Sequence, residues 1–154
     1  MNMTLAHGRS PRGERAYDKK PVSPGKTVNT VAVLSTQSLE GPWRYQESLT
    51  AKWFVAYLEV YLLPLLLGGK RLVMDNHPVH RSRLVQKFLK SHVVRYVFFP
   101  PYSPELNPIE EVWSKFKQYL KRAKARTVDD LLDAMDKASK TISPDDCQGC
   151  FQHA

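Results

Sequence analysis

Two carboxylates stand where a folded chain could aim them at one point. Asp75 closes a short apolar run, residues 71–74, and Glu110 follows after 34 intervening residues, behind a proline-rich stretch. We expect Asp75 at the end of a strand and Glu110 at the start of a helix. Such rigid positions can hold side chains around a shared ion, and magnesium and manganese prefer carboxylate oxygens. The pair predicts part of a metal site for phosphodiester chemistry, although two carboxylates rarely complete one.

The elements around this pair alternate between strand and helix. Residues 71–74 and 93–99 are predicted strands, and residues 80–90 are a predicted helix between them. The helix is expected to turn one apolar face inward, formed by Leu84, Val85, Phe88 and Leu89. This order predicts a βαβ unit with parallel strands, and the fold class is therefore mixed α/β.

Further elements are predicted on either side of this unit. Residues 28–35 and 43–46 favour an antiparallel strand pair with a turn at Gly41-Pro42, and an amphipathic helix follows the cap residue Thr50 and stops at Gly68-Gly69. Asn107, as a cap before Pro108, opens a helix to about residue 122. Its inward face includes Trp113 and Phe116. A last helix is predicted from residue 127 to about residue 141.

Size and charge limit the possible functions. A chain of 154 residues with 42% hydrophobic residues forms one domain, which we place at residues 28–154, after a basic, loop-rich segment at residues 1–27. Lys and Arg number 23 against 15 Asp and Glu, a net charge of +8 that favours nucleic acid as the partner. No signal peptide is visible, and the apolar stretch 57–67 is too short for a bilayer, so no membrane partner and a cytoplasmic location are expected.

Two cysteines near the end of the sequence leave two interpretations open. Cys147 and Cys150 have the spacing of half a zinc site, with His153 as the one further ligand nearby. A single pair of this kind is weak evidence for a metal. Reduced free thiols are the simpler interpretation.

Longer motifs around the two carboxylates resemble one family. Residues 73–76 (VMDN) with His80, and residues 99–113 (FPPYSPELNPIEEVW), resemble the transposase domain of the mariner-type insertion-sequence superfamily. Residues 8–15 (GRSPRGER) look like the family's segment after its first catalytic aspartate. Residues 150–154 (CFQHA) look like its closing residues, so the resemblance covers nearly the whole chain.

The resemblance implies an RNase H-like mixed sheet flanked by helices, and an enzyme class. In this family two Asp residues and one Glu hold two divalent cations, magnesium or manganese, and cut and join DNA at transposon ends. Asp75 matches the second acidic residue and Glu110 the third. Supporting residues would be Asn76, His80 and Asn107. Candidate DNA-binding residues are Arg9, Arg12, Lys115, Lys121 and Arg122.

The sequence departs from the family's pattern at its start. The family's first aspartate lies just before the segment matched by residues 8–15, and no residue before Gly8 here is acidic. We therefore expect an N-terminally truncated fold whose first strand is absent or partial, and a chain inactive alone. Three origins of such a chain are compatible with the sequence: a split reading frame, a decayed remnant, or a misplaced start codon. The expected partners are double-stranded DNA, the upstream half of a split transposase and further copies in a dimer or larger complex, at the nucleoid of a bacterium.

Structural alternatives remain for each candidate. Glu110 lies three residues after Asn107, where a capping-box glutamate belongs, and Glu111 is its neighbour. Asp75 could instead form a turn with Asn76. Asp18 could in principle replace the absent aspartate. The whole chain could also be a non-catalytic DNA-binding or interaction remnant of a transposase, which would bind DNA without needing a metal.

Overall fold

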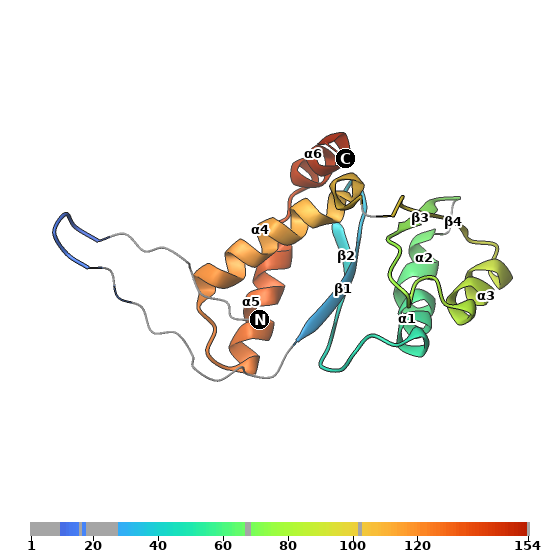
Figure 1. Cartoon of the computed structure of the whole chain (residues 1–154), viewed down its shortest axis with the longest axis horizontal. Helices are drawn as coiled ribbons and strands as arrows, with labels where there is room; N and C mark the ends of the chain where they lie inside the picture. The colour runs from blue at the N-terminus through green and yellow to red at the C-terminus, as the bar shows by residue number, and fades with distance from the viewer. Residues whose placement is uncertain (1–9, 16, 18–27, 67–68, 102, 154) are drawn as a thin grey trace.

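A β-hairpin lies in the middle of the molecule, between two groups of helices (Figure 1). The structure, a computed structural model, describes residues 10–15, 17, 28–66, 69–101 and 103–153. On one side of the hairpin lie α4 (Pro108–Ala123), α5 (Val128–Lys140) and α6 (Pro144–His153). On the other side lie α1 (Ala51–Tyr57), η1 (Leu58–Leu62), α2 (Leu63–Leu66), β3 (Arg71–Met74), α3 (Arg83–Ser91) and β4 (Arg95–Phe98).

The hairpin consists of β1 (Asn29–Leu34) and β2 (Leu39–Tyr45), and the predicted antiparallel pairing is confirmed. The predicted turn at Gly41-Pro42 is wrong, because both residues lie inside β2. Val31 pairs with Trp43 and Val33 with Glu40, so Gly41 and Pro42 together oppose one residue of β1. This is a β-bulge, which accommodates a proline and places Gly41 at a φ of 56°.

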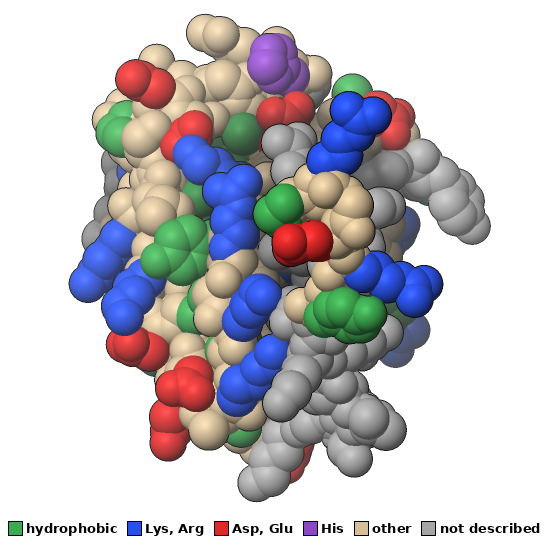
Figure 2. Space-filling view, turned by 90° about the vertical axis from the view of Figure 1, so that its left-hand side faces the viewer, with side chains coloured by type: hydrophobic (Ala, Val, Ile, Leu, Met, Phe, Trp, Pro, Cys, Tyr) green, Lys and Arg blue, Asp and Glu red, His purple; other side chains and the backbone are tan. Residues whose placement is uncertain are grey.

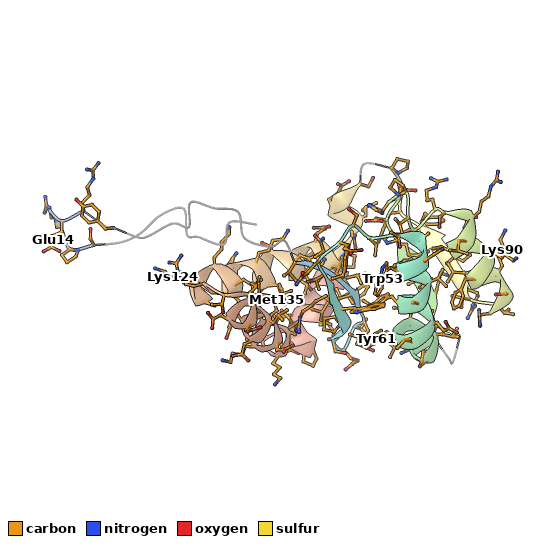
Figure 3. All side chains as sticks on the ribbon, turned by 90° about the horizontal axis from the view of Figure 1, so that it is seen from below. Glu14, Trp53, Tyr61, Lys90, Lys124 and Met135 are labelled. Atoms are coloured by element: carbon orange, nitrogen blue, oxygen red, sulfur yellow. The ribbon has the colours of Figure 1, made fainter. Side chains whose placement is uncertain are left out.

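Helix α1 packs on the hairpin through aromatic rings. The Thr50 hydroxyl caps the helix by accepting from the Trp53 amide, as predicted. The Trp43 ring of β2 lies 5.3 Å from Trp53, 5.8 Å from Tyr57 and 5.8 Å from Tyr61, measured between ring centroids. Figure 3 shows Trp53 and Tyr61 on the side of α1 and η1 that faces the hairpin. These four rings, Trp43, Trp53, Tyr57 and Tyr61, form the aromatic cluster.

The predicted βαβ unit is confirmed, with β3 and β4 parallel and α3 between them. One face of this small sheet packs into the core beside α1 and α3 through Leu72 and Met74, while Val73 and Val97 on the other face remain about half exposed. In α3, Val85 and Leu89 are fully buried as expected, but Leu84 is 44% exposed and its inward placement was wrong.

The residue expected to begin the second parallel strand instead ends α3. Val93 has a φ of 54° and donates its amide to the Lys90 carbonyl, and the next amide, that of Val94, donates to the Leu89 carbonyl. These two bonds form a Schellman motif, in which the left-handed residue usually is glycine. The strand therefore starts only at Arg95.

Helices α4, α5 and α6 cover the other side of the hairpin. Phe116 of α4 packs with Ala134 and Met135 of α5, and Trp113 lies against Phe116, which confirms both α4 residues as core. Thr127 and Asp130 form a capping box at the start of α5. Helix α6 was not predicted, although Ser143, Pro144 and Asp146 are a recognisable helix start.

The hairpin serves as the shared layer between the two groups of helices. Val31, Val33 and Trp43 pack toward α1, whereas Leu34 and Leu39 pack against α4 and α6. Among the described residues, strands pair only as β1 with β2 and as β3 with β4, so the two sheets share no hydrogen-bonded strands. No helix within the described ranges is long and apolar enough to cross a membrane.

Candidate active site

Asp75 directly follows β3, at the carboxyl end of the parallel pair, where its carboxylate is held by two donors. His80 Nδ1 lies 2.6 Å from Oδ1, and the His77 amide donates to the same oxygen at 3.0 Å. The turn alternative for Asp75 is therefore confirmed, because the bond from the His77 amide closes an Asx turn. The turn leaves the other carboxylate oxygen available, since Oδ2 receives no hydrogen bond from the part of the chain that the structure describes.

These bonds keep Asp75 ionised. The hydrogen bond from His80, followed by the one from the His77 backbone, holds the pKa of Asp75 below its ordinary value, against the opposing effect of partial burial. An ionised carboxylate only accepts, so His80 must carry its proton on Nδ1. The His80 ring packs 4.3 Å from the Phe54 ring, between centroids, and its Nε2 is buried without a partner among the described residues.

Asn76 links the Asp75 segment to the chain that leads to Glu110. Its side-chain amide donates to the Phe99 carbonyl at 2.5 Å, and its oxygen accepts from Arg81 at 2.9 Å. The Phe99 amide donates to the Met74 carbonyl at 2.9 Å. The carboxyl ends of β3 and β4 are therefore fixed to each other beside Asp75, and the proline-rich loop starts from this point. Arg81, which also stacks over the Phe98 ring, was not singled out from the sequence.

Glu110 lies in the first turn of α4, where it was predicted, and is exposed. Asn107 is the cap residue and its carbonyl accepts the Glu110 amide at 3.0 Å, but its side chain makes no capping bond. The capping-box alternative for Glu110 is therefore wrong. The neighbouring Glu111 points to α6, where His153 lies 3.6 Å from its Oε2. Of the two glutamates, Glu110 is the one without a partner among the described residues.

These residues fit a hard divalent cation in part. Asp75 offers an ionised oxygen and Glu110 a carboxylate that has no partner among the described residues, and oxygen donors of this kind suit magnesium or manganese. No group of three or more His, Cys, Asp or Glu side chains with metal-binding geometry forms within the described ranges. Asp18, the other acidic candidate, lies outside them.

The candidate DNA-binding residues have different surroundings. Lys115 forms an ion pair with Asp146 of α6, whereas Arg122 is exposed and Lys121 is half-buried on α4. Arg12 is exposed in an N-terminal turn, and Arg9 lies outside the described residues. Figure 2, which views the side formed by α4, α5 and α6, shows Lys and Arg side chains spread over this face.

The two cysteines lie on the inward side of α6. Both are free thiols, buried against Val112 and Ile142. Burial raises the pKa of Cys147 and of Cys150, and the nearby Glu111 carboxylate raises that of Cys150 further. Thiols in this state are poor nucleophiles and weak metal ligands, so their contribution is to the core between α4 and α6.

Solved structures identify the fold. A pre-cleavage Mos1 transpososome superimposes with a TM-score of 0.78 at 13% identity, over 97% of this chain and 47% of that chain. The Mos1 mariner paired-end complex with Mn gives a TM-score of 0.74 at 15% identity, over 97% of this chain and 47% of that chain. The catalytic domain of Mos1 mariner transposase gives a TM-score of 0.63 at 12% identity, over 82% of this chain and 76% of that chain. The chain therefore has the RNase H-like α/β fold of a transposase catalytic domain.

Sequence relatives narrow this class to one family. Residues 1–132 match the family described as DDE superfamily endonuclease, and the chain belongs to it. The Tc1 transposase of Caenorhabditis elegans is 27% identical over 112 residues, which cover 70% of this chain and 41% of that protein. An IS630 insertion-element protein of Shigella sonnei is 31% identical over 75 residues, which cover 47% of this chain and 22% of that protein. The chain thus spans less than half the length of these relatives.

Proposed function

We propose that this chain is the C-terminal part of a DDE transposase, which cleaves DNA at transposon ends and joins it to a target with two divalent cations, magnesium or manganese. Asp75 and Glu110 are the ligands that this chain supplies. A third carboxylate comes from an upstream portion of the protein, either fused or supplied as a separate half, so that residues 1–154 alone are inactive. The active complex contains two or more copies.

The state of Asp75 is the observation that carries this proposal. Its carboxylate is ionised and fixed on Oδ1 by His80 and His77 at the end of a parallel strand, and its Oδ2 has no partner among the described residues. Ligands converge at the carboxyl ends of the strands in open parallel sheets. The Asn76 bond to Phe99 fixes the loop toward Glu110 at the same end.

Each residue has a separate part in the reaction. When bound, the cations activate the attacking oxygen and stabilise the leaving oxygen of a phosphodiester. Asp75 and Glu110 hold negative charge where those ions bind. His80 fixes the Asp75 carboxylate through Oδ1, and Arg81 holds Asn76 in place. Exposed cations of α4 such as Arg122 bind the DNA backbone, with Arg12 and Lys121 as weaker candidates.

The test compares neighbouring carboxylates in a longer protein that carries the upstream portion. Asp75→Asn and Glu110→Gln should each reduce cleavage and strand transfer at least about 100-fold, because a lost charge contact to the ions removes several kcal/mol of transition-state stabilisation. Glu111→Gln is the matched control, since it removes the same charge from the same helix turn, and it should retain most activity. Manganese-induced broadening of NMR signals near residues 75 and 110 provides a readout that is independent of turnover.

Three results would contradict the proposal. Equal losses for Glu110→Gln and Glu111→Gln would reject the site assignment. Robust strand transfer by residues 1–154 alone would reject the need for an upstream carboxylate. If DNA binding proved indifferent to metal and to both substitutions, and no longer protein were active, the chain would be a non-catalytic DNA-binding remnant.

A further inference from the structure

A segment beside the candidate active site contains positive charge with no acidic residue to balance it. Residues 76–104 include five cations and no Asp or Glu. Two of the five are used locally: Arg81 donates to Asn76, and Arg95 donates to the Gly69 carbonyl. The remaining three, Arg83, Lys87 and Lys90, all belong to α3.

These three cations lie on one face of α3. Their spacing of four and three residues places them along a single helix face, and each is exposed. Within the described residues, no hydrogen bond or ion pair engages the charged side chains of these three residues. Together with Gln86 and Ser91 they line a shallow groove on the surface. We call Arg83, Lys87 and Lys90 the α3 basic face.

Helix α5 shows what an ordinary solvated charge pattern looks like in this chain. It also ends in two lysines three residues apart, Lys137 and Lys140, but it carries four aspartates. Lys137 pairs with Asp133 at 2.9 Å. Charges of both signs on α5 cancel locally, whereas those of the α3 basic face add to one another. A field of one sign attracts a polyanion.

The α3 basic face also begins next to Asp75. Ser82, which caps α3 by accepting the Val85 amide, follows Arg81, and Arg81 contacts Asn76. The face then leads away from the site. Figure 3 shows Lys90 at the outer end of α3, away from the hairpin. DNA lying along α3 would therefore extend from the candidate active site.

We propose that the α3 basic face binds the phosphate backbone of duplex DNA on one side of the Asp75 site. Arg83 and Lys90 are separated by about 10 Å along the helix axis, which corresponds to about three steps of about 3.4 Å between the phosphates of one DNA strand along the duplex axis. The contact positions the duplex and carries no sequence preference. This inference rests on the proposed function only in taking DNA as the substrate.

The test measures binding of a short DNA duplex to residues 1–154 by fluorescence anisotropy, without divalent metal, between about 50 and 200 mM salt. Lys87→Gln/Lys90→Gln should weaken binding and reduce the slope of log affinity against log salt by about 2, since each phosphate contact contributes about 0.9. Arg83→Gln should reduce it by about 1. Lys137→Gln/Lys140→Gln, with the same spacing and the same charge loss, should leave the slope unchanged.

The outcomes separate this contact from the rest of the function. Equal changes in both lysine pairs would show a net-charge effect and overturn the inference, as would an unchanged slope in Lys87→Gln/Lys90→Gln, or no binding by the unaltered chain. Circular dichroism and melting of each variant establish that it is folded. The salt slope is measured without divalent metal, whereas the metal site is tested by cleavage and by manganese broadening in the longer protein, so failure of the metal site and failure of the α3 basic face give different results.

Discussion

At Asp75 a single side chain, His80, governs both the charge and the orientation of the candidate metal ligand. Its Nδ1 lies 2.6 Å from Oδ1, and this bond is the main reason that the pKa of Asp75 is lowered. Metal-site geometry commonly depends on such outer partners of the ligands. His80 is therefore a positioning residue, which acts on the site through Asp75.

The Asp75–His80 hydrogen bond should contribute to the way the free energy of unfolding changes at acidic pH. Because the folded pKa of Asp75 lies below the ordinary value of 3.8, its stabilisation is complete above about pH 5 and is lost as pH falls through the lower folded pKa. His80→Phe retains a ring against Phe54 and removes the bond, so the pKa of Asp75 should return toward 3.8. The effect on the free energy of unfolding should be under about 1 kcal/mol, since Asp75 is 54% exposed.

This prediction is checked by titrating the Asp75 carboxyl carbon by NMR. His92→Phe serves as the control, because His92 also packs on a phenylalanine, Phe88, but its Nδ1 bonds to a backbone carbonyl and a serine rather than to a carboxylate. An unchanged Asp75 titration in His80→Phe would assign the lowered pKa to the His77 amide instead.

Sequence alone could identify the two carboxylates but only some of their supporting contacts. Asp75 and Glu110 stand out because residue type and element boundary coincide there. The role of Asn76 depends on a carbonyl 23 residues away, at Phe99, and Arg81 is visible only once Asn76 is placed. Contacts across a parallel strand pair have no local signal, so they require the fold.

At the scale of elements, the end of α3 carries backbone strain. Val93 occupies the left-handed position of a Schellman motif with a φ of 54°, and its side chain is 87% exposed. A β-branched residue is unfavourable there by about 1–2 kcal/mol, whereas asparagine tolerates the conformation. This position is therefore a site where stability can be gained without losing core contacts.

Val93→Asn should stabilise the protein by about 1 kcal/mol, which corresponds to a rise of about 2–4 °C in Tm. The measurement is thermal unfolding followed by circular dichroism. Val60→Asn is the matched control, because Val60 is also exposed, at 61%, but lies in η1 without a positive φ. It should be neutral or slightly destabilising. A loss of stability in Val93→Asn would mean that the strain is absent.

Element type was more predictable than element ends. The apolar periodicity that predicted α4 and α5 is a strong signal, and their caps at Asn107 and Thr127 lie where expected. Val93 was assigned to a strand because β-branched residues favour strands, and Gly41-Pro42 to a turn because these residues usually form turns. In both cases tertiary contacts outweighed local preference. Val93 forms the left-handed end of α3, and Gly41-Pro42 forms a bulge within the paired strands.

At the scale of the whole molecule, the hairpin lies between two groups of helices, and in the described part of the chain neither of its strands pairs with β3 or β4. Trp43 connects it to α1 and η1 through three aromatic neighbours, and Leu34 and Leu39 connect it to α4 and α6. The phenol oxygen of Tyr57 is buried beneath this contact without a partner among the described residues, and burial raises the pKa of Tyr57. The aromatic cluster thus packs the hairpin against α1 and η1.

Trp43→Ala should lower the free energy of unfolding by about 3 kcal/mol, because it removes the central ring of the cluster and leaves a cavity between layers. Trp43→Phe should recover much of the loss. Trp53→Ala is the comparison, and it should cost less because the Trp53 side chain is 49% exposed. Urea denaturation followed by circular dichroism measures all three, and equal losses at both positions would contradict a central role for Trp43.

The positions of the three tryptophans give the protein a built-in optical reporter. Trp43 and Trp53 meet between the hairpin and α1, whereas Trp113 lies against Phe116 on the far side of the hairpin. Intrinsic fluorescence of a variant that keeps only Trp113 would follow one half of the molecule, and a Trp113→Phe variant would follow the other. Emission spectra could therefore tell which half responds first when DNA, metal or an upstream segment binds.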